Sequence, residues 1–580
     1  MEVRSSLIDP GKWKPIGVDR LEPTAEEVVR GEGTFSVIAG PGAGKTELLA
    51  QKAAFLLQTG RCPAPQRILA ISFKKDAAKN LGERIKMRCS PEQAARFDSL
   101  TFDAFAKGLL DRFRLALPEG LRPTANYVIL KEDPVTQGLG KKELFQNPSE
   151  LSFPMIQRQV NVLLKGNHLL VKALRLTYSH VFLDEFQDAT SPQWQPVQTA
   201  FSGSTAQFTA VGDHKQKIMA WAGAVPDIFR KFEEAFSATR KELRFNYRSV
   251  AGLVRIQHDL AVAIDQNSIS VVPQRGEGPD PKICSVWEFD SKDSEATHLV
   301  NYIREALGNG VSPRRLVLLV RQRAEKLENQ LSPYFVKAEI GIRNEARQLD
   351  GVAIQDLVTE PLAELVLNFL KFGSKRRCRS LWTQSLEHLL ELRGIDPGNE
   401  HAMRKAESEL GEFHARLHSQ MEVISKSEED VGKLVSSILD FCSEAALKTL
   451  APQYRQGDWY DKVKKSCILL LWESIQGSVT WDTVFDRFEG VHNIPLMTIH
   501  KSKGLEFHTV LFVGLDNESF WGMKEKQEEG LLEFFVAFSR AEDRAFFTYC
   551  KDRGQRDLVK IIYDTLKKAG VHSYSPCTTY

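Results

Sequence analysis

Short apolar runs alternate with amphipathic stretches through the first part of the chain. The runs TFSVIA (34–39), ILAISF (68–73), VFLDE (181–185) and FTAVGD (208–213) have the length and the residue types of buried strands. The segment TELLAQKAAFLLQ, which follows the first run, has its apolar residues at helical spacing. Strands that alternate with helices predict a parallel sheet that is covered by helices on both faces.

The same alternation returns later in the chain, after stretches that interrupt it. LVLLV (316–320) and VLFVGL (510–515) indicate a second α/β lobe that begins near Lys241. One interruption contains several prolines and short helical pieces, and the other is charged, amphipathic and almost without strand signal. We therefore predict an α/β fold with two parallel-sheet lobes and two mainly helical insertions. The expected boundaries are 1–108 and 178–240 for the first lobe, 109–177 for the first insertion, 241–345 and 494–580 for the second lobe, and 346–493 for the second insertion.

Composition narrows the class of protein without indicating a ligand. The 580 residues include 77 basic and 75 acidic ones, so nucleic-acid binding would require a local groove of positive charge. The eight cysteines include no CxxC pair, which argues against a zinc knuckle or a local iron–sulfur cluster. The N-terminus has no apolar signal segment, and no apolar run reaches the ~18–20 residues of a membrane span. We expect a cytoplasmic protein without a membrane partner.

The segment AGPGAGKT (39–46) lies between a predicted strand and a predicted helix. Its glycines allow the backbone N–H groups to turn toward phosphates, and the start of the helix adds a positive partial charge. Lys45 is expected to reach the β- and γ-phosphates, and the hydroxyl of Thr46 to bind Mg²⁺. The expected nucleotide-binding residues of this loop are Gly40, Gly42, Ala43, Gly44, Lys45 and Thr46.

The segment VFLDEFQD ends in acids that follow an apolar strand. The carboxyl edge of a parallel sheet is where folds of this class bind their ligands. Asp184 suits the binding of Mg²⁺, and Glu185 suits the base that orients and deprotonates an attacking water. Alone, such acids are more often helix caps, but the phosphate-loop pattern earlier in the chain favours the catalytic interpretation.

Several motifs occur in a fixed order and resemble the motif set of superfamily 1A DNA helicases, the UvrD/Rep/PcrA family. They are AGPGAGKT, ILAISFKKDAAKNLGERI, LTFDAF, FLDEFQD, VGDHKQKIMAWAGA, NYRS, MTIHKSKGLEF and VAFSRA. The resemblance covers roughly residues 19–108, 178–345 and 494–550. It implies two RecA-like motor lobes, with insertions where the family carries its 1B and 2B subdomains. It also implies an ATP- and Mg²⁺-dependent enzyme that moves 3′→5′ along single-stranded DNA.

The resemblance assigns roles to individual residues. Gln216 is similar to the γ-phosphate sensor, and Arg248 and Arg540 to two arginine fingers from the second lobe. Tyr247 is similar to the residue that stacks on adenine, and Glu506, which follows Gly504, to the residue that binds the ribose. The residues that resemble DNA contacts are Ser72, Phe73, Thr101, Phe102, His500 and Trp221, the last of which would stack on a base.

The chain departs from the family pattern at several positions. Ala25 stands where the family has an adenine-reading glutamine, so we expect weak discrimination between purines. Asp103 replaces the histidine of a TFHxF-like motif. The third motif lacks the family's usual Tyr, Arg and acidic pair, and has Met219, Ala222, His214 and Lys215 in their places. DNA contacts are therefore expected to be weaker or altered.

These observations leave three functional hypotheses. One is a translocating helicase on single-stranded or partly duplex DNA, and another is a DNA-stimulated ATPase that senses DNA or activates a partner without processive unwinding. The third, an inactive binding module, is disfavoured by the hydrolysis residues, which all match. Short chains of this kind occur beside OLD-family nucleases in antiviral systems of the Gabija type. Such a nuclease is therefore a candidate partner, and DNA repair is the other candidate pathway.

Overall fold

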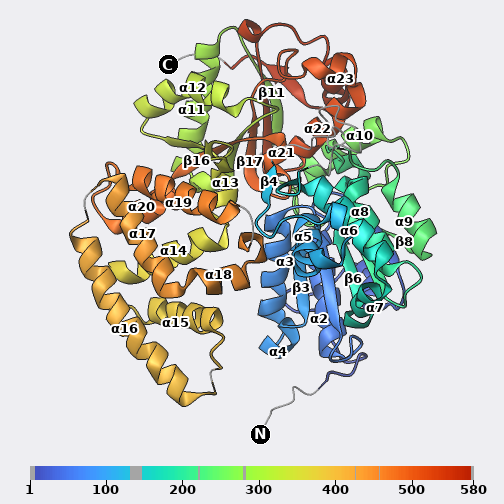
Figure 1. Ribbon diagram of the computed structural model, residues 1–580. Helices are drawn as coiled ribbons and strands as arrows, with labels where there is room; N and C mark the ends of the chain where they lie inside the picture. Colours follow the sequence, from blue (N-terminus) through green and yellow to red (C-terminus); the bar gives the residue numbers. More distant parts are fainter. Residues whose placement is uncertain are drawn as a thin grey trace.

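The computed structural model describes residues 7–130, 147–219, 223–278, 282–396, 398–424, 426–455 and 458–576. Two parallel sheets with flanking helices lie one above the other in Figure 1, and a group of helices lies beside them at the lower left. This arrangement confirms the predicted α/β class with two lobes. Across the described ranges, no helix is long and apolar enough to cross a membrane.

The first lobe is built on a six-stranded parallel sheet in the order β3-β2-β6-β7-β1-β8. Neighbouring residues of a strand enter different cores, as Val37 and Ile38 do in β1, because strand side chains alternate between the faces. Both faces are covered, which explains the nearly continuous apolar strands. The strands are β1 (Phe35–Ala39), β2 (Arg67–Ser72), β3 (Phe97–Thr101), β6 (Tyr178–Asp184), β7 (Gln207–Gly212) and β8 (Thr239–Leu243).

Helices from two parts of the chain cover this sheet. One face is covered by α1 (Pro23–Arg30), α2 (Lys45–Gln58) and α3 (Lys75–Arg88). The other face is covered by α5 (Phe102–Phe113), α6 (Phe153–Gly166), α7 (His168–Thr177), α8 (Ser191–Phe201) and α9 (Ile228–Phe236).

Two predicted boundaries of the first lobe are wrong. Strand β8 pairs with β1 through Leu243, so the boundary predicted at residue 240 falls inside a strand. The stretch 109–177 is not a separate body within its described residues, because α5 runs across its start and α6 packs in the core of the first lobe. Within the described residues of this stretch, the short strands β4 (Val128–Leu130) and β5 (Glu150–Ser152) form a separate two-stranded sheet.

The second lobe has a seven-stranded parallel sheet in the order β13-β16-β12-β17-β18-β11-β19. Its strands are β11 (Cys284–Phe289), β12 (Leu316–Val320), β13 (Gly341–Asn344), β16 (Asn493–Thr498), β17 (Phe507–Phe512), β18 (Ala541–Cys550) and β19 (His572–Tyr574). Helices α10 (Ala251–Ile264), α22 (Gln527–Phe538) and α23 (Lys560–Lys568) cover one face. Helices α11 (Lys292–Gly308) and α12 (Ala324–Lys337) cover the other.

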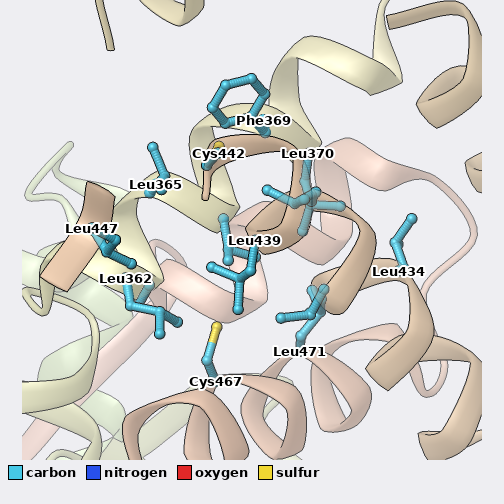
Figure 2. Packing of buried hydrophobic residues seen from close by; sticks show 14 of the residues in the cluster. Leu362, Leu365, Phe369, Leu370, Leu434, Leu439, Cys442, Leu447, Cys467 and Leu471 are labelled. Atoms are coloured by element: carbon cyan, nitrogen blue, oxygen red, sulfur yellow. The ribbon is translucent and has the colours of Figure 1, made fainter. Parts of the chain in front are cut away.

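A helical insertion leaves and rejoins the second sheet between two adjacent strands. Gly341 of β13 pairs with Asn493 of β16, although about 150 residues separate them in the chain. A small hairpin of β14 (Gln348–Leu349) and β15 (Val352–Ala353) comes first. The helices are α13 (Ile354–Leu357), α14 (Pro361–Ser374), α15 (Arg379–Arg393), α16 (Glu400–Glu422), α17 (Glu428–Cys442), α18 (Glu444–Leu450), α19 (Trp459–Ile475) and α20 (Trp481–Glu489). Figure 2 shows their shared core of leucines around Phe369, Cys442 and Cys467.

The helical insertion docks on α3 of the first lobe through charged groups. The Nζ atom of Lys75 lies 2.6 Å from Oε1 of Glu360, and Lys79 forms an ion pair with Glu364. The hydroxyl of Thr359 donates a hydrogen bond to Asp76 over 3.1 Å. The insertion is thus fixed against the lobe that carries the phosphate loop.

Candidate active site

The phosphate loop is closed against a segment that leads toward the second lobe. Gly42 and Gly44 have φ angles of 72° and 78°, which only glycine adopts without strain. A Cβ atom on Gly42 would lie 2.7 Å from Oδ1 of Asn246 and 2.8 Å from Cβ of Arg248. The side chain of Asn246 also donates to the carbonyl of Pro41 over 3.0 Å. Glycine is therefore required both by the turn and by this close approach.

Lys45 begins α2 and points back over the loop. Its Nζ atom donates to the carbonyl oxygens of Ala39 and Gly40 over 3.2 and 3.3 Å. Burial lowers the pKa of Lys45, while the charges of Glu185 and Asp213 act in the opposite direction. A bound polyanion would favour the charged ammonium here, so the site fits phosphate groups.

Two carboxylates stand at the carboxyl end of β6. Glu185 has left-handed backbone angles (φ 49°, ψ 40°), an uncommon conformation that turns its side chain out of the strand direction. Burial and the charge of Glu185 raise the pKa of Asp184. Burial opposes the ionisation of Glu185, but Lys45 and Lys503 lower its pKa. The charges of Lys45 and Lys503 also act against the shift in Asp184, so the same two cations influence both carboxylates.

Gln187 connects this carboxylate to the next strand. Its Nε2 atom donates to Oε2 of Glu185 over 2.6 Å, and its Oε1 atom accepts from the backbone N–H of Asp213 over 3.0 Å. Asp213 in turn accepts a 3.0 Å hydrogen bond from Nε2 of Gln216. The sequence analysis did not assign a role to Gln187 or Asp213, although both lie in motifs that it quoted.

The second lobe contributes two arginines to the same place. The Nη2 atom of Arg540 donates to Oε1 of Gln216 over 2.9 Å. Burial and the nearby charge of Arg248 lower the pKa of Arg540 to about 9. The Nε atom of Arg248 donates to Oε2 of Glu506 over 3.0 Å. Both guanidinium groups thus point into the gap between the lobes.

A cleft of about 820 Å³ joins these groups. It lies between the phosphate loop of the first lobe and the β16–β17 and α22–β18 connections of the second lobe. A cleft between two parallel-sheet lobes with convergent polar groups is a characteristic ligand site. The predicted residues that line it are Gly42, Ala43, Gly44, Lys45, Thr46, Phe73, Asp184, Glu185, Gln216, Tyr247, Arg248, Gly504, Glu506 and Arg540.

Two family models match the chain in the order of its lobes. A model of the UvrD/REP helicase N-terminal domain matches residues 21–133 and 135–237, and a model of the UvrD-like helicase C-terminal domain matches residues 467–552. Together they cover more than half of the chain. The chain belongs to the UvrD/Rep helicase family. It is therefore an ATP-hydrolysing enzyme of the helicase class.

Named helicases are similar to this UvrD/Rep-family chain over most of their length. DNA helicase II of Escherichia coli strain K12 is 24% identical over 91% of this chain and 84% of that protein. ATP-dependent DNA helicase Rep of the same strain is 24% identical over 92% of each chain. A probable DNA helicase II homolog of Mycoplasma capricolum subsp. capricolum is 25% identical over 89% of this chain and 82% of the relative.

Lys503 of the second lobe contacts residues of the first lobe in this UvrD/Rep-family chain, and the sequence patterns did not identify it. Lys503 forms an ion pair with Asp188, and its Nζ atom donates to the carbonyl of Gln216 over 2.8 Å. The same atom lies 3.8 Å from Oε2 of Glu185. Its position directly before the predicted residue Gly504 is the signal that could have identified it.

The residues predicted to contact DNA are not all accessible. Phe73 lines the cleft, and His500 is half-buried in α21 (Ile499–Ser502). Ser72 is fully buried, and Phe102 is only 2% exposed in the core of the first lobe. A direct contact between the ring of Phe102 and a DNA strand is therefore contradicted, because this ring packs in the core of the first lobe. The hydroxyl of Thr101 accepts from the N–H of Ala104 over 3.0 Å and so caps α5. Trp221 and Ala222 lie outside the described residues.

The end of the cleft where a base is predicted to bind differs from the family pattern described above. Tyr247 is 43% exposed, and its backbone N–H donates to the carbonyl of Gly42 over 2.9 Å. Ala25 is buried in the core beside α2, so no side-chain amide is offered from that position. The nearby carboxylate of Glu22 already accepts from the backbone N–H groups of Arg244 and Phe245 over 2.8 and 3.2 Å.

Proposed function

We propose that this chain is an ATP-dependent DNA translocase and helicase, which couples hydrolysis to movement along single-stranded DNA in the 3′→5′ direction. The observation that carries the proposal is the division of the hydrolysis residues between two lobes. Lys45 and Glu185 belong to the first lobe, whereas Arg248 and Arg540 come from the second. A change in the distance between the lobes would therefore change the rate of hydrolysis, as a motor requires.

The residues of the cleft fit a nucleoside triphosphate with Mg²⁺. Thr46 and Asp184, which both line the cleft, would hold the ion. Within the described ranges, no group of three or more His, Cys, Asp or Glu side chains could hold a metal ion. This agrees with Mg²⁺, which uses one or two protein ligands together with phosphate oxygens and water. When bound, the ion would neutralise charge on the β- and γ-phosphates.

The protein groups have separate tasks in this proposal. Glu185 is held ionised by Lys45 and Lys503 and oriented by Gln187, so it can accept a proton from an attacking water. Lys45 balances charge on the β- and γ-phosphates from one side. Arg540 and Arg248 approach from the other lobe with planar guanidinium groups that suit the equatorial oxygens.

The DNA strand is proposed to lie across both lobes, near Phe73 and His500 and the Trp221 segment. The relatives named above as DNA helicases support DNA as the ligand, and the 3′→5′ direction rests on the family resemblance. Bases stacked on aromatic side chains and phosphates held by local charge would give binding without sequence preference. A cytoplasmic location, an OLD-family nuclease partner and a role in antiviral defence or DNA repair stay predictions.

The alternative is a DNA-stimulated ATPase that does not unwind processively. One observation favours it: within its described residues, the stretch 109–177 packs on the first lobe and does not form a separate body that could meet a duplex. The deciding measurement is ATP turnover with oligo-dT, beside strand displacement on duplexes with 3′ or 5′ tails. Displacement only from 3′ tails supports the helicase, turnover without displacement supports the alternative, and no response to DNA contradicts both.

A further inference from the structure

A half-buried lysine of the first lobe, Lys74, forms hydrogen bonds to the second lobe. Lys74 follows Phe73 and precedes α3. Its Nζ atom donates hydrogen bonds to the carbonyl oxygens of His500 and Lys503, both over 2.9 Å. Residues more than 400 positions apart in the chain are thereby joined. A buried cation is tolerated only where such partners satisfy it.

The carbonyls that Lys74 binds belong to the end of a very short helix. Helix α21 has four residues, and the carbonyls at a helix end have no partner within the helix. A short helix of this kind is not stable by itself, so its position depends on tertiary contacts. Lys74 supplies one of these contacts from the opposite lobe. It therefore fixes where α21 ends relative to the first lobe.

The end of α21 determines where Lys503 points. The side chain of Lys503 contacts Asp188, the carbonyl of Gln216 and, at 3.8 Å, the carboxylate of Glu185. A displacement of α21 would thus move a cation away from the proposed catalytic base.

The same short segment contains a residue that is predicted to contact DNA. His500 lies on α21, and Phe73 is the immediate neighbour of Lys74 in the chain. Burial lowers the pKa of Lys74 to about 8, Lys503 and Lys501 lower it further, and Asp76 and Asp188 act against them. Below that pH the ammonium makes charge-assisted bonds to both carbonyls, which are stronger than neutral ones.

We propose that Lys74 is a positioning residue for hydrolysis, because it holds the end of α21 so that Lys503 stays beside Glu185. The segment that is predicted to contact the DNA strand is thereby connected to the proposed catalytic base. The inference rests on the proposed function for the role of the strand. The effect on Glu185 itself requires only the contacts described above. Lys74 lines the cleft beside Phe73. It touches no reacting atom in this proposal, and it acts on Glu185 through Lys503.

The test compares Lys74→Met with Lys74→Arg and a matched control. Lys79→Met removes a lysine within α3 that forms an ion pair with Glu364 of the helical insertion but does not touch α21. ATP turnover at saturating substrate is measured with and without oligo-dT. Binding of a fluorescent non-hydrolysable ATP analogue, binding of labelled oligo-dT and thermal unfolding are measured for each protein.

We expect Lys74→Met to lower kcat about tenfold or more, both with and without the strand, because a displaced charge beside a catalytic base affects turnover strongly. Affinities for the analogue and for oligo-dT should stay within about twofold, since the Nζ atom of Lys74 is engaged by the carbonyls of His500 and Lys503 and the phosphate loop is unchanged. Lys74→Arg should recover most of the rate, and Lys79→Met should match the wild type. If the Met variant does not fold, Lys74→Gln provides the same comparison without the charge.

Several results would overturn the inference. They are a kcat of Lys74→Met within about twofold of the wild type, a loss confined to ATP affinity, and an equal loss of kcat in Lys79→Met. Failure of the proposed function is distinguishable, because it would show as wild-type turnover that does not respond to oligo-dT. In that case the strand-free rate of Lys74→Met still decides whether Lys74 positions the base.

Discussion

The Nη2 atom of Arg540 donates a hydrogen bond to Oε1 of Gln216 over 2.9 Å, although the two residues are 324 positions apart. Gln216 follows β7 of the first sheet, and Arg540 directly precedes β18 of the second sheet. Gln216 is bonded to Asp213, which is bonded to Gln187, which is bonded to Glu185. An unbroken set of hydrogen bonds therefore runs from the arginine of one lobe to the base of the other. This set of hydrogen bonds would be complete only when the two lobes are close to each other.

Lys45→Ala should abolish ATP hydrolysis. Lys45 is the lysine whose Nζ atom lies over the phosphate loop, and its loss removes a charge that would face the β- and γ-phosphates. The folded state should persist, because the change removes side-chain atoms that bond only to carbonyls of the loop. Steady-state phosphate release measures the loss of hydrolysis. Turnover within about threefold of the wild type would contradict the assignment of the phosphate loop.

Glu185→Gln should retain nucleotide binding and stop turnover. The amide has the shape of the carboxylate and keeps an oxygen that can accept from Nε2 of Gln187, but it cannot take a proton from water. The comparison is between analogue affinity and kcat in the same preparation. Hydrolysis that survives while binding is lost would show that the roles of Asp184 and Glu185 are divided incorrectly.

How much of this site can be predicted from the sequence depends on how far apart in the chain the interacting residues are. The phosphate loop and the strand ends at Asp184 could be predicted, because a strand, a turn and a helix are local patterns. Lys503 and Gln187 could not be assigned, since their roles arise only when distant segments meet. Strand β8 was missed because its sequence, TRKEL, is polar at an edge of the sheet and lacks the apolar signal of a buried strand.

The first insertion shows a second limit of sequence patterns. The apolar spacing of α6 predicts a helix with one buried face, but it does not say which surface that face meets. The family resemblance suggested a separate subdomain, whereas the described part of this stretch packs against the first lobe. A long stretch without strand signal has to form its own core, and the described residues between Leu349 and Phe488 share one.

Asp103→Asn should stabilise the protein near neutral pH. Burial raises the pKa of Asp103 to about 6, while hydrogen bonds from Gln193 and Gln157 and the charge of Lys75 act against this. The folded state then binds more protons than the unfolded state between about pH 4 and 6, so stability falls as the pH rises through that window. The variant should lose this slope and gain about 1–2 kcal/mol at pH 7. Urea unfolding at pH 4, 5, 6 and 7 measures it; an unchanged slope would contradict the shift.

Discrimination between ATP and GTP should be weak. Ala25 is buried and offers no amide to the base, and the carboxylate of Glu22 is already engaged by the backbone of Arg244 and Phe245. Without a side chain that penalises the wrong base, selectivity should fall, and we expect GTP to be hydrolysed within about tenfold of ATP. Competitive turnover assays decide this. A strict preference for ATP would show that another group, such as the backbone near Tyr247, reads the base.

The last prediction concerns the coupling of DNA binding to hydrolysis. Arg540 reaches Gln216 only when the lobes are close, and a ligand that spans both lobes shifts that equilibrium by its differential affinity for the closed state. Single-stranded DNA should therefore raise ATP turnover. Trp221→Ala should reduce the stimulation and spare the basal rate, because it removes stacking worth ~1–3 kcal/mol per base but no phosphate contact.

Arg540→Ala provides the contrast to Trp221→Ala. It should lower both the basal and the stimulated rate, because it removes charge from the proposed transition state and also the hydrogen bond to Gln216. The measurement is turnover against oligo-dT concentration for the wild type and the two variants. Undiminished stimulation in Trp221→Ala would place the coupling elsewhere, for example at Phe73, the chain neighbour of Lys74, and at His500, whose carbonyl Lys74 binds. A basal rate that survives in Arg540→Ala would remove this arginine from the catalytic site.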